Sequence, residues 1–273
     1  MSVEVMRSVI DAAEGRVPVD TLFTNAQIVD VYGQRVVPGS VAVKDGVIVG
    51  VLYSGRDDAA GTYEATDVID CQGRYIAPGF IDGHLHIESS NIRPAEYARM
   101  AATRGTTTAI ADSHEIANVA GCDGITYMMQ ATKDLPLDVF FMVPSCVPAT
   151  DLDESGACLN ADDITPFYND RRVLGLAEMM NAFGVNQADG SVLSKIKTTL
   201  EHDRIIDGHA PLLCGKELNA YTAAGIRSDH ECSNIAEAKE KLSRGQWIMI
   251  REGTAAKNLQ ELMPLFELSL IHI

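Results

Sequence analysis

Positive charge, aromatic residues and long apolar runs are all scarce in this sequence. Its 273 residues include 22 Lys and Arg against 38 Asp and Glu, a formal net charge of −16. We therefore expect no nucleic-acid partner, because binding phosphates needs clustered Lys and Arg. Aromatic residues make up 6% of the chain, while 46% of the residues are hydrophobic and 22% are charged. These fractions are ordinary for a globular protein and exclude the disordered and fibrous classes.

The sequence also lacks the patterns of membrane and exported proteins. Apolar runs such as 139–143 are far shorter than the roughly 20 residues that span a bilayer, which predicts no membrane partner. Residues 1–10 carry Glu4 and Arg7 and do not show the basic and then apolar order of a signal peptide. The six cysteines are irregularly spaced without a C-x-x-C pair, so we expect free thiols and a cytoplasmic location.

The first part of the chain is typical of a small β-rich domain. Residues 2–14 have helical spacing and are followed by Gly15, a common helix stop. Short β-branched runs then alternate with turn signals over residues 22–77, including the hairpin signal Lys44-Asp45-Gly46. We predict a domain over residues 1–79 that consists of a helix and a mostly antiparallel β module.

Beyond Pro78-Gly79, short apolar runs alternate with helical segments, the pattern of an α/β fold with a parallel sheet. Seven candidate strands lie at 80–85, 107–111, 139–143, 173–177, 204–207, 225–228 and 247–250. Candidate helices lie at 94–103, 124–132, 161–168, 192–201, 216–224 and 235–242. No G-x-G-x-x-G motif follows the first strand, which disfavours a dinucleotide-binding sheet. We therefore predict a (β/α)8 TIM-type barrel over residues 80–267 that lacks its eighth strand.

Five of the seven histidines lie at or just after the carboxyl end of a candidate strand. They are His84, His86, His114, His209 and His230. In a barrel of parallel strands these ends open onto one face, where active sites are built. A single histidine at such a position is usually structural, but five in register favour a common site.

A metal site is the chemistry that these residues favour. His84 and His86 alternate along one strand and so point to the same side, where they can share an ion. Glu178 ends the fourth candidate strand and could bridge two ions, although the position also suits a carboxylate that starts a helix. Mixed imidazole and carboxylate ligands suit Zn, Mn or Fe rather than Mg or Ca. Two such ions make hydroxide available near neutral pH and a carboxylate moves the proton, so we expect a hydrolase.

Residues 78–86, with the sequence Pro-Gly-Phe-Ile-Asp-Gly-His-Leu-His, resemble the first-strand motif of the amidohydrolase superfamily. That resemblance implies a metal-dependent barrel beside a small β-sandwich to which N-terminal residues contribute. Nearly the whole chain is similar to the bacterial adenine deaminases, a family within that superfamily. The similar segments are 84–90, 112–115, 144–149, 175–180, 207–211, 215–221 and 249–253.

The resemblance implies hydrolysis of adenine to hypoxanthine and ammonia in purine salvage, with hydroxide attacking C6 and with manganese or iron as the metal; zinc is a further candidate. It implies that His84 and His86 bind one ion and that Glu178 bridges to a second. His209 and His230 would bind the second ion, and Glu178 and His230 are the expected catalytic residues. Residues expected to contact the substrate or to support the metal ligands are Glu88, Asp112, His114, Glu115, Arg251 and Glu252.

Three departures from related patterns refine this expectation. Glu178 stands where many relatives use a carboxylated lysine, which favours the adenine deaminase branch. The chain lacks the P-C-x-x-C signature of the zinc nucleobase deaminases. The family's eighth strand ends in an aspartate that binds metal and moves a proton, and no residue of this chain matches it. We therefore expect an N-terminal fragment in which residues 268–273 are not native coding sequence.

Such a fragment is expected to have an open edge between its first and seventh strands. Unpaired backbone groups there favour aggregation, low stability and little activity, while the five retained ligands still bind metal. The complete protein would act on a small molecule and is compatible with a homo-oligomer. Two alternatives remain open: another amidohydrolase that acts on a cyclic amide or an N-acetyl group, and a non-catalytic metal-binding protein.

Overall fold

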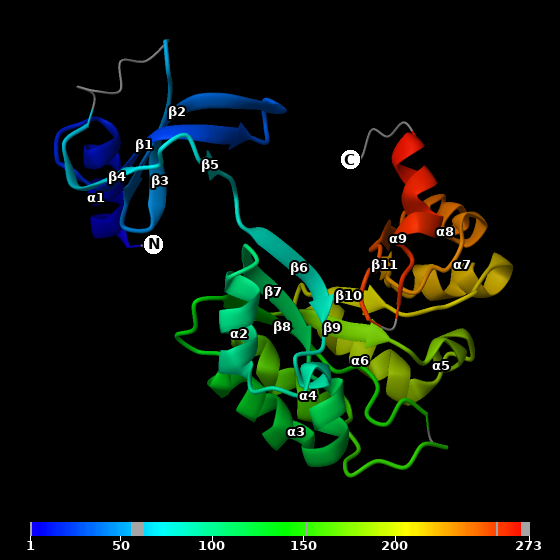
Figure 1. The fold of residues 1–273 in the computed structure, drawn as a ribbon. Coiled ribbons are helices and arrows are strands. Elements are labelled where there is room, and N and C mark those ends of the chain that lie inside the picture. The colour runs from blue at the N-terminus through cyan, green and yellow to red at the C-terminus, as the bar shows by residue number, and fades with distance from the viewer. Residues whose placement is uncertain (1, 56–62, 151, 255, 269–273) are drawn as a thin grey trace. The chain divides into compact units, whose positions relative to one another are not determined.

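A computed structural model describes residues 2–55, 63–150, 152–254 and 256–268. The chain divides into two compact units, Met1–Pro78 and Gly79–Ile273, which are described separately (Figure 1). The predicted non-native tail lies outside the described residues from position 269 onwards. All six cysteines are free thiols. Within the described ranges, no helix combines the length and apolar character needed to cross a membrane.

The first unit combines one helix with a five-stranded sheet. Helix α1 (Val3–Ala13) is capped by the Ser2 side chain, which accepts a hydrogen bond from the Val5 amide. The strands are β1 (Val19–Asp30), β2 (Arg35–Lys44), β3 (Val47–Tyr53), β4 (Ala65–Asp70) and β5 (Tyr75–Ile76). The β2–β3 hairpin turns through Asp45 and Gly46, both at positive φ, as the sequence signal predicts.

The prediction of a mostly antiparallel module is correct only for β1, β2 and β3. Strands β4 and β5 both pair with β1 in parallel. Parallel neighbours need a crossover rather than a tight turn, and the intervening β2–β3 hairpin carries the chain back before β4 begins. Ala12 of α1 packs with Val19, Leu22 and Ala42 of the sheet in one of the unit's small apolar cores.

The second unit contains the predicted parallel sheet. Five parallel strands have the order β10-β9-β8-β7-β6. They are β6 (Phe80–Leu85), β7 (Thr106–Asp112), β8 (Asp138–Val143), β9 (Val173–Met179) and β10 (Ile205–Gly208). Two short strands, β11 (Ser228–Asp229) and β12 (Trp247–Ile248), form a separate parallel pair. The Arg227 amide donates to the Ile206 carbonyl at 3.4 Å and so holds β11 beside β10.

The helices of this unit connect the strands or follow the last of them (Figure 1). They are η2 (Glu88–Ser90), α2 (Pro94–Ala102), α3 (His114–Ala131), α4 (Ala161–Ile164), η3 (Thr165–Asn169), α5 (Ala182–Asn186), α6 (Gly190–Glu201), α7 (Gly215–Ala223), α8 (Ile235–Leu242), α9 (Leu259–Leu262) and η4 (Met263–Glu267). The prediction of a helix at 124–132 found only the second half of α3, because Gly121 at φ 58° kinks the helix and breaks its period. The five-residue α5 was not predicted.

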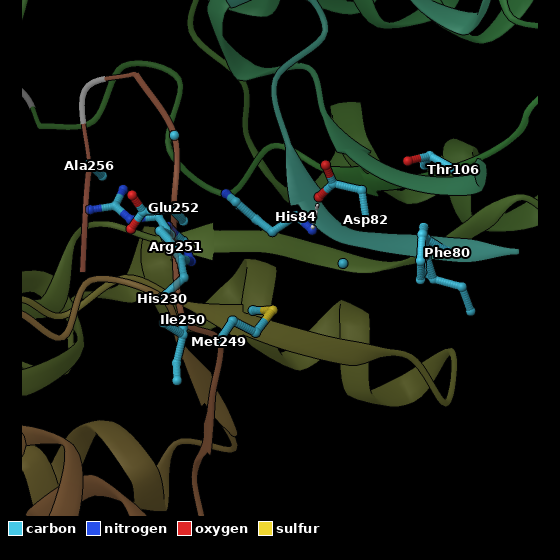
Figure 2. A pocket seen from close by; sticks show the side chains of 13 residues that line it. Phe80, Asp82, His84, Thr106, His230, Met249, Ile250, Arg251, Glu252 and Ala256 are labelled. Atoms are coloured by element: carbon cyan, nitrogen blue, oxygen red, sulfur yellow. Dashed lines mark hydrogen bonds between the residues drawn. The ribbon is translucent and has the colours of Figure 1, made fainter. Parts of the chain in front are cut away.

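The strands therefore curl only part of the way round a barrel, which confirms the predicted fold with its open side. Among the described strands, β6 pairs only with β7, and β12 pairs only with β11. Phe80, Ile81 and Trp247 are each more than 60% exposed. A cavity of about 600 Å³ lies between β6 and residues 249–253 (Figure 2).

We predict that Gly175→Ala destabilises the second unit by more than about 2 kcal/mol. Gly175 lies in β9, where a Cβ atom would overlap with the backbone carbonyl of Ile205 on β10. Gly190→Ala at the start of α6 is the matched control, since a Cβ atom there meets no neighbour. Urea unfolding of the two variants measures the difference, and equal midpoints would contradict the close packing of β9 and β10.

Candidate metal centre

All five histidines singled out in the sequence converge with Glu178 at the carboxyl ends of the strands. They follow or end β6, β7, β10 and β11, while Glu178 is the next-to-last residue of β9. The Glu178 side chain is 4% exposed and lies at the centre of the group. The side chains come from five strands spread over about 150 residues of sequence, and parallel strand order alone brings them to one face.

The two carboxylate oxygens of Glu178 face different histidines. On one side, Glu178 Oε2 lies 2.7 Å from His209 Nδ1, 2.8 Å from His230 Nε2 and 3.9 Å from His84 Nε2. On the other side, Glu178 Oε1 lies 3.4 Å from His114 Nδ1 and 3.6 Å from His86 Nε2. Burial would raise the pKa of Glu178, but the hydrogen bonds and charges of His209 and His230 hold it well below its usual range. The carboxylate is therefore ionised.

Hydrogen bonds fix the orientation of His84 and His86. His84 Nδ1 lies 3.1 Å from Asp207 Oδ2, and His86 Nδ1 lies 3.0 Å from the Asp112 carbonyl. Because both partners are hydrogen-bond acceptors, each Nδ1 donates to its partner, which leaves each Nε2 facing Glu178. The His84 Nε2 atom is buried without a hydrogen-bond partner in the described part of the chain.

These donors fit a divalent metal ion. Three groups of imidazole and carboxylate atoms have all their ligand atoms within 4.8 Å of one another, and two of the groups share Glu178. The His84 ring stacks on the His230 ring with 3.9 Å between centroids, so these two imidazoles are also close together. A buried nitrogen without a hydrogen-bond partner beside an ionised carboxylate is costly, and a cation bound between them would satisfy both groups.

His114 lies between two carboxylates. Its Nδ1 atom is 2.8 Å from Asp112 Oδ2, in addition to its contact with Glu178. Burial opposes protonation of His114, but the Asp112 hydrogen bond and the charges of Asp112 and Glu178 raise its pKa to about 9. In the metal-free protein, His114 is therefore protonated near neutral pH, and its positive charge lies between the carboxylates of Asp112 and Glu178.

A buried lysine supports the loops that carry two of the histidines. Lys241 of α8 is fully buried and donates to Asp229 Oδ2 at 2.7 Å, to Glu237 Oε1 at 2.8 Å and to the Ala210 carbonyl at 2.6 Å. Asp229 also accepts from the amides of Ala210 and Glu231, which flank His209 and His230 in sequence. The network thus fixes the backbone next to His209 and His230. These two residues belong to the donor group, which consists of His84, His86, His114, Glu178, His209 and His230.

A tyrosine and a serine hold the backbone of β9 and β10. The Tyr221 hydroxyl donates to the Met179 carbonyl at 2.7 Å and accepts from the His209 amide at 2.9 Å. The Ser145 hydroxyl donates to the Glu178 carbonyl at 2.5 Å. Buried Lys195 of α6 donates in turn to the Ser145 carbonyl at 2.8 Å. The position of Glu178 is therefore set by hydrogen bonds from three neighbouring elements.

The remaining predicted residues lie around the donor group in different ways. Glu88 accepts from the Ile116 amide, and Glu115 accepts from Ser89, so both carboxylates tie the loop after β6 to α3. Arg251 forms an ion pair with Glu231, with Nη2 2.8 Å from Oε2. Glu252 accepts from the Leu259 amide at the start of α9.

Four residues in or beside the donor group were not predicted from the sequence as site residues: Asp207, Asp229, Glu231 and Lys241. Glu231 Oε1 lies 3.7 Å from His209 Nδ1 and 3.6 Å from His230 Nε2. Three of these residues could have been predicted from the sequence, because Asp207, Asp229 and Glu231 lie within two residues of a strand-end histidine. Lys241 gave no such signal, since a lysine in an amphipathic helix normally faces solvent.

The cavity on the open side of the sheet reaches this donor group. His84 and His230 line it together with Asp82, Met249 and Arg251. Figure 2 shows Asp82 and His84 on β6, with Met249, Ile250 and Arg251 on the facing segment. A small molecule bound in the cavity would therefore lie next to two of the candidate metal ligands.

The second unit is thus a partial barrel of parallel strands with five histidines and a central carboxylate at its carboxyl end. The model of the amidohydrolase family matches residues 75–268. The chain belongs to the amidohydrolase family.

Curated relatives share much of the sequence. The adenine deaminase of Clostridium acetobutylicum is 49% identical over 254 residues, which are 93% of this chain and 43% of that protein. The adenine deaminase of Desulfatibacillum aliphaticivorans is 48% identical over 257 residues, 94% of this chain and 44% of that protein. The chain thus spans less than half the length of these relatives.

Solved structures with lower sequence identity share the fold. An N-acyl-D-glutamate deacylase from Bordetella bronchiseptica is 16% identical with a TM-score of 0.57, and the match covers 86% of this chain and 58% of that chain. A D-hydantoinase is 17% identical with a TM-score of 0.55, covering 84% and 57% respectively. At these identities the likeness shows the fold alone.

We predict that the metal-free chain loses stability as the pH rises from about 6.5 to 9. The folded pKa of His114 is above its unfolded value, so its contribution is fully present below pH 6.5 and is lost as the pH rises through the folded pKa. The slope is at most about 1.4 kcal/mol per pH unit. Urea unfolding in the presence of a chelator measures it. A His114→Asn variant should flatten the profile, whereas exposed His202→Asn should leave it unchanged; an equal slope in all three proteins would contradict the assignment.

We predict that Lys241→Met lowers the free energy of unfolding by about 3–5 kcal/mol, because Asp229 and Glu237 are left as buried charges without their partner. Lys197→Met is the matched control. Lys197 is an exposed residue of α6 whose ion pair with Glu201 is 3.6 Å long, and its loss should change stability by less than about 0.5 kcal/mol. Thermal and urea unfolding compare the two variants, and similar values would refute the role given to Lys241.

Proposed function

We propose that this chain is the metal-binding part of an adenine deaminase, which hydrolyses adenine to hypoxanthine and ammonia. The observation that carries the proposal is the sequence match to relatives named adenine deaminase, which are 45–49% identical over at least 93% of the chain. The donor residues all lie within the segment that the amidohydrolase family model matches.

We propose that His84, His86, Glu178, His209 and His230 hold two divalent ions, manganese or iron, with zinc as a further candidate. The buried His84 Nε2 atom, which has no hydrogen-bond partner in the described part of the chain, and the ionised Glu178 support this assignment. When bound, such ions act as Lewis acids and make water nucleophilic near neutral pH.

The chain's own residues would bind the base and hold the ions beside it. The cavity of about 600 Å³ is within the size range of small-molecule sites and opens onto His84 and His230. Arg251 and Glu252 line its wall and are the proposed contacts to the polar edge of the base. Glu178 and His230 are the proposed catalytic residues, because Glu178 Oε2 and His230 Nε2 lie 2.8 Å apart and would together hold an ion that activates the attacking water. The aspartate of the family's eighth strand, which no residue of this chain matches, would take the proton of the water and pass it to the departing amino group.

The cellular setting belongs to the same proposal. Turnover of free adenine would place the protein in purine salvage, and a cytoplasmic location is part of the proposal. A homo-oligomer of the complete protein is part of the proposal, and neither nucleic acid nor a membrane is a partner.

The proposal is tested with a longer protein, in which this chain is followed by the additional segment of a relative. The chain is joined to the C-terminal remainder of the Clostridium acetobutylicum relative, loaded with Mn²⁺ or Fe²⁺, and given adenine, a dihydropyrimidine or an N-acetyl amino acid. Formation of hypoxanthine and ammonia in equal amounts is expected. Turnover of the cyclic amide or the N-acetyl compound instead would support another amidohydrolase, and metal binding without any turnover would support a non-catalytic protein.

We predict that Glu178→Gln lowers kcat/KM for adenine in this extended protein by about 10³-fold or more, because the central negative charge that would hold the two ions is lost. Glu201→Gln, at the exposed end of α6, is the matched control and should keep the parental rate. Steady-state kinetics with circular dichroism as a check of folding measures both variants. A Glu178→Gln enzyme within tenfold of the parent would refute the central role of the carboxylate.

A further inference from the structure

Glu231 and Arg251 form an ion pair at the wall of the cavity, and the proposed function gives Glu231 no role. We propose that Glu231 positions the Arg251 guanidinium so that it donates a hydrogen bond to a ring nitrogen on the reacting edge of the bound base. The pair thereby selects ligands that carry an acceptor on this edge. The inference rests on the proposed function for the identity of the base, whereas the contacts between the two side chains do not depend on it.

Two contacts fix the guanidinium of Arg251 against the carboxylate of Glu231. Arg251 Nη2 donates to Glu231 Oε2 at 2.8 Å, and Arg251 Nη1 contacts Glu231 Oε1. A two-point pair of this kind sets the plane of the guanidinium as well as its distance, which a single contact does not do. The Arg251 side chain is 36% exposed and the Glu231 side chain is 17% exposed, so water screens the pair only in part. Arg251 is therefore held in one orientation.

Both partners of the ion pair are anchored to the same buried residue, Asp229. The Glu231 amide donates to Asp229 Oδ1 at 2.5 Å, and buried Lys241 donates to Asp229 Oδ2 at 2.7 Å. The Met249 amide donates to the Asp229 carbonyl at 3.0 Å, which ties the segment that carries Arg251 to this residue as well. The two side chains are thus brought together by their backbones before a ligand binds.

Arg251 keeps hydrogen-bond donors that no described residue uses. Each Nη atom carries two hydrogens, and Glu231 accepts one from each. Arg251 Nε is buried and has no hydrogen-bond partner in the described part of the chain. A buried donor without a partner is costly, and an acceptor atom on a bound ligand removes that cost. The guanidinium is therefore suited to a ligand that accepts hydrogen bonds.

The lining of the cavity suits a planar heterocycle next to this pair. Among the described residues that line the cavity, Arg251 is the one lysine or arginine. The apolar part of the lining consists of Phe80, Ile81, Met249 and Ile250. Figure 2 shows Arg251 on the same side of the view as His230, and Glu231 Oε1 lies 3.6 Å from His230 Nε2. A ring whose reacting carbon lies at the metal ligands therefore turns an adjacent polar edge towards Arg251.

The test removes the acceptor from the ligand and the donor from the protein, separately and together. The extended protein is kept metal-free with a chelator so that adenine is not consumed. Calorimetry then compares adenine with 1-deazaadenine and 7-deazaadenine, which each lack one ring nitrogen of the reacting edge. In the parent, at least one analogue should bind about tenfold or more weakly than adenine. In Arg251→Met this preference for adenine should fall below about threefold.

Variants of Glu231 test whether it acts through Arg251. Glu231→Gln keeps the size of the side chain but loses its charge, and it should lose most of the preference for adenine. Adding Glu231→Gln to Arg251→Met should change the preference no further. Arg251→Lys keeps the charge without the two-point contact and should also lose the preference. Arg99→Met and Glu96→Gln, in an exposed ion pair of α2, are matched controls that should keep it, and circular dichroism confirms folding.

Several results would overturn the inference. They are no binding of adenine, equal affinities of the parent for adenine and both analogues, and an unchanged preference in Arg251→Met. Parental preference in Glu231→Gln or Arg251→Lys would overturn the positioning role of Glu231. Turnover of adenine by the metal-loaded protein, measured separately, distinguishes this failure from failure of the proposed function. Turnover without the expected preferences contradicts only the inference, whereas the expected preferences without turnover support the inference and contradict adenine deamination.

Discussion

The structure of the second unit is organised around one buried carboxylate. Glu178 is 4% exposed and ionised, and an ion in the protein interior is tolerated only when its surroundings supply compensating charge or hydrogen-bond donors. His209 and His230 supply them directly, and the other three histidines lie within 3.9 Å of its oxygens. The positions of the five strand ends therefore depend on where the Glu178 side chain lies.

Support for this carboxylate extends outward through polar groups that are themselves buried. Ser145 and Tyr221 hold the backbone at the end of β9, and Lys241 joins the loops after β10 and β11. Each of these groups has its hydrogen bonds satisfied by named partners, which is the condition under which a buried polar network rigidifies a site. The donor atoms are thereby held in place before any ligand binds.

Much of this could be predicted from sequence, and the limits have physical causes. The parallel strands β6–β9 contain short apolar runs that alternate with helical segments, so their positions follow from the sequence pattern, as does the convergence of the strand-end histidines. The parallel pairing of β4 with β1 and the kink at Gly121 depend on tertiary packing and on backbone conformation, which local patterns do not encode. The buried position of Lys241 and the two faces of Glu178 likewise depend on distances between segments far apart in the chain.

The most direct measurement of the central claim is anomalous X-ray diffraction from crystals of the chain grown with Mn²⁺. The account predicts two anomalous peaks, one on each side of the Glu178 carboxylate and each within about 2.0–2.3 Å of its ligand atoms. Peaks at surface carboxylates alone, or no peak between the histidines, would contradict the assignment of a metal centre to this face of the sheet.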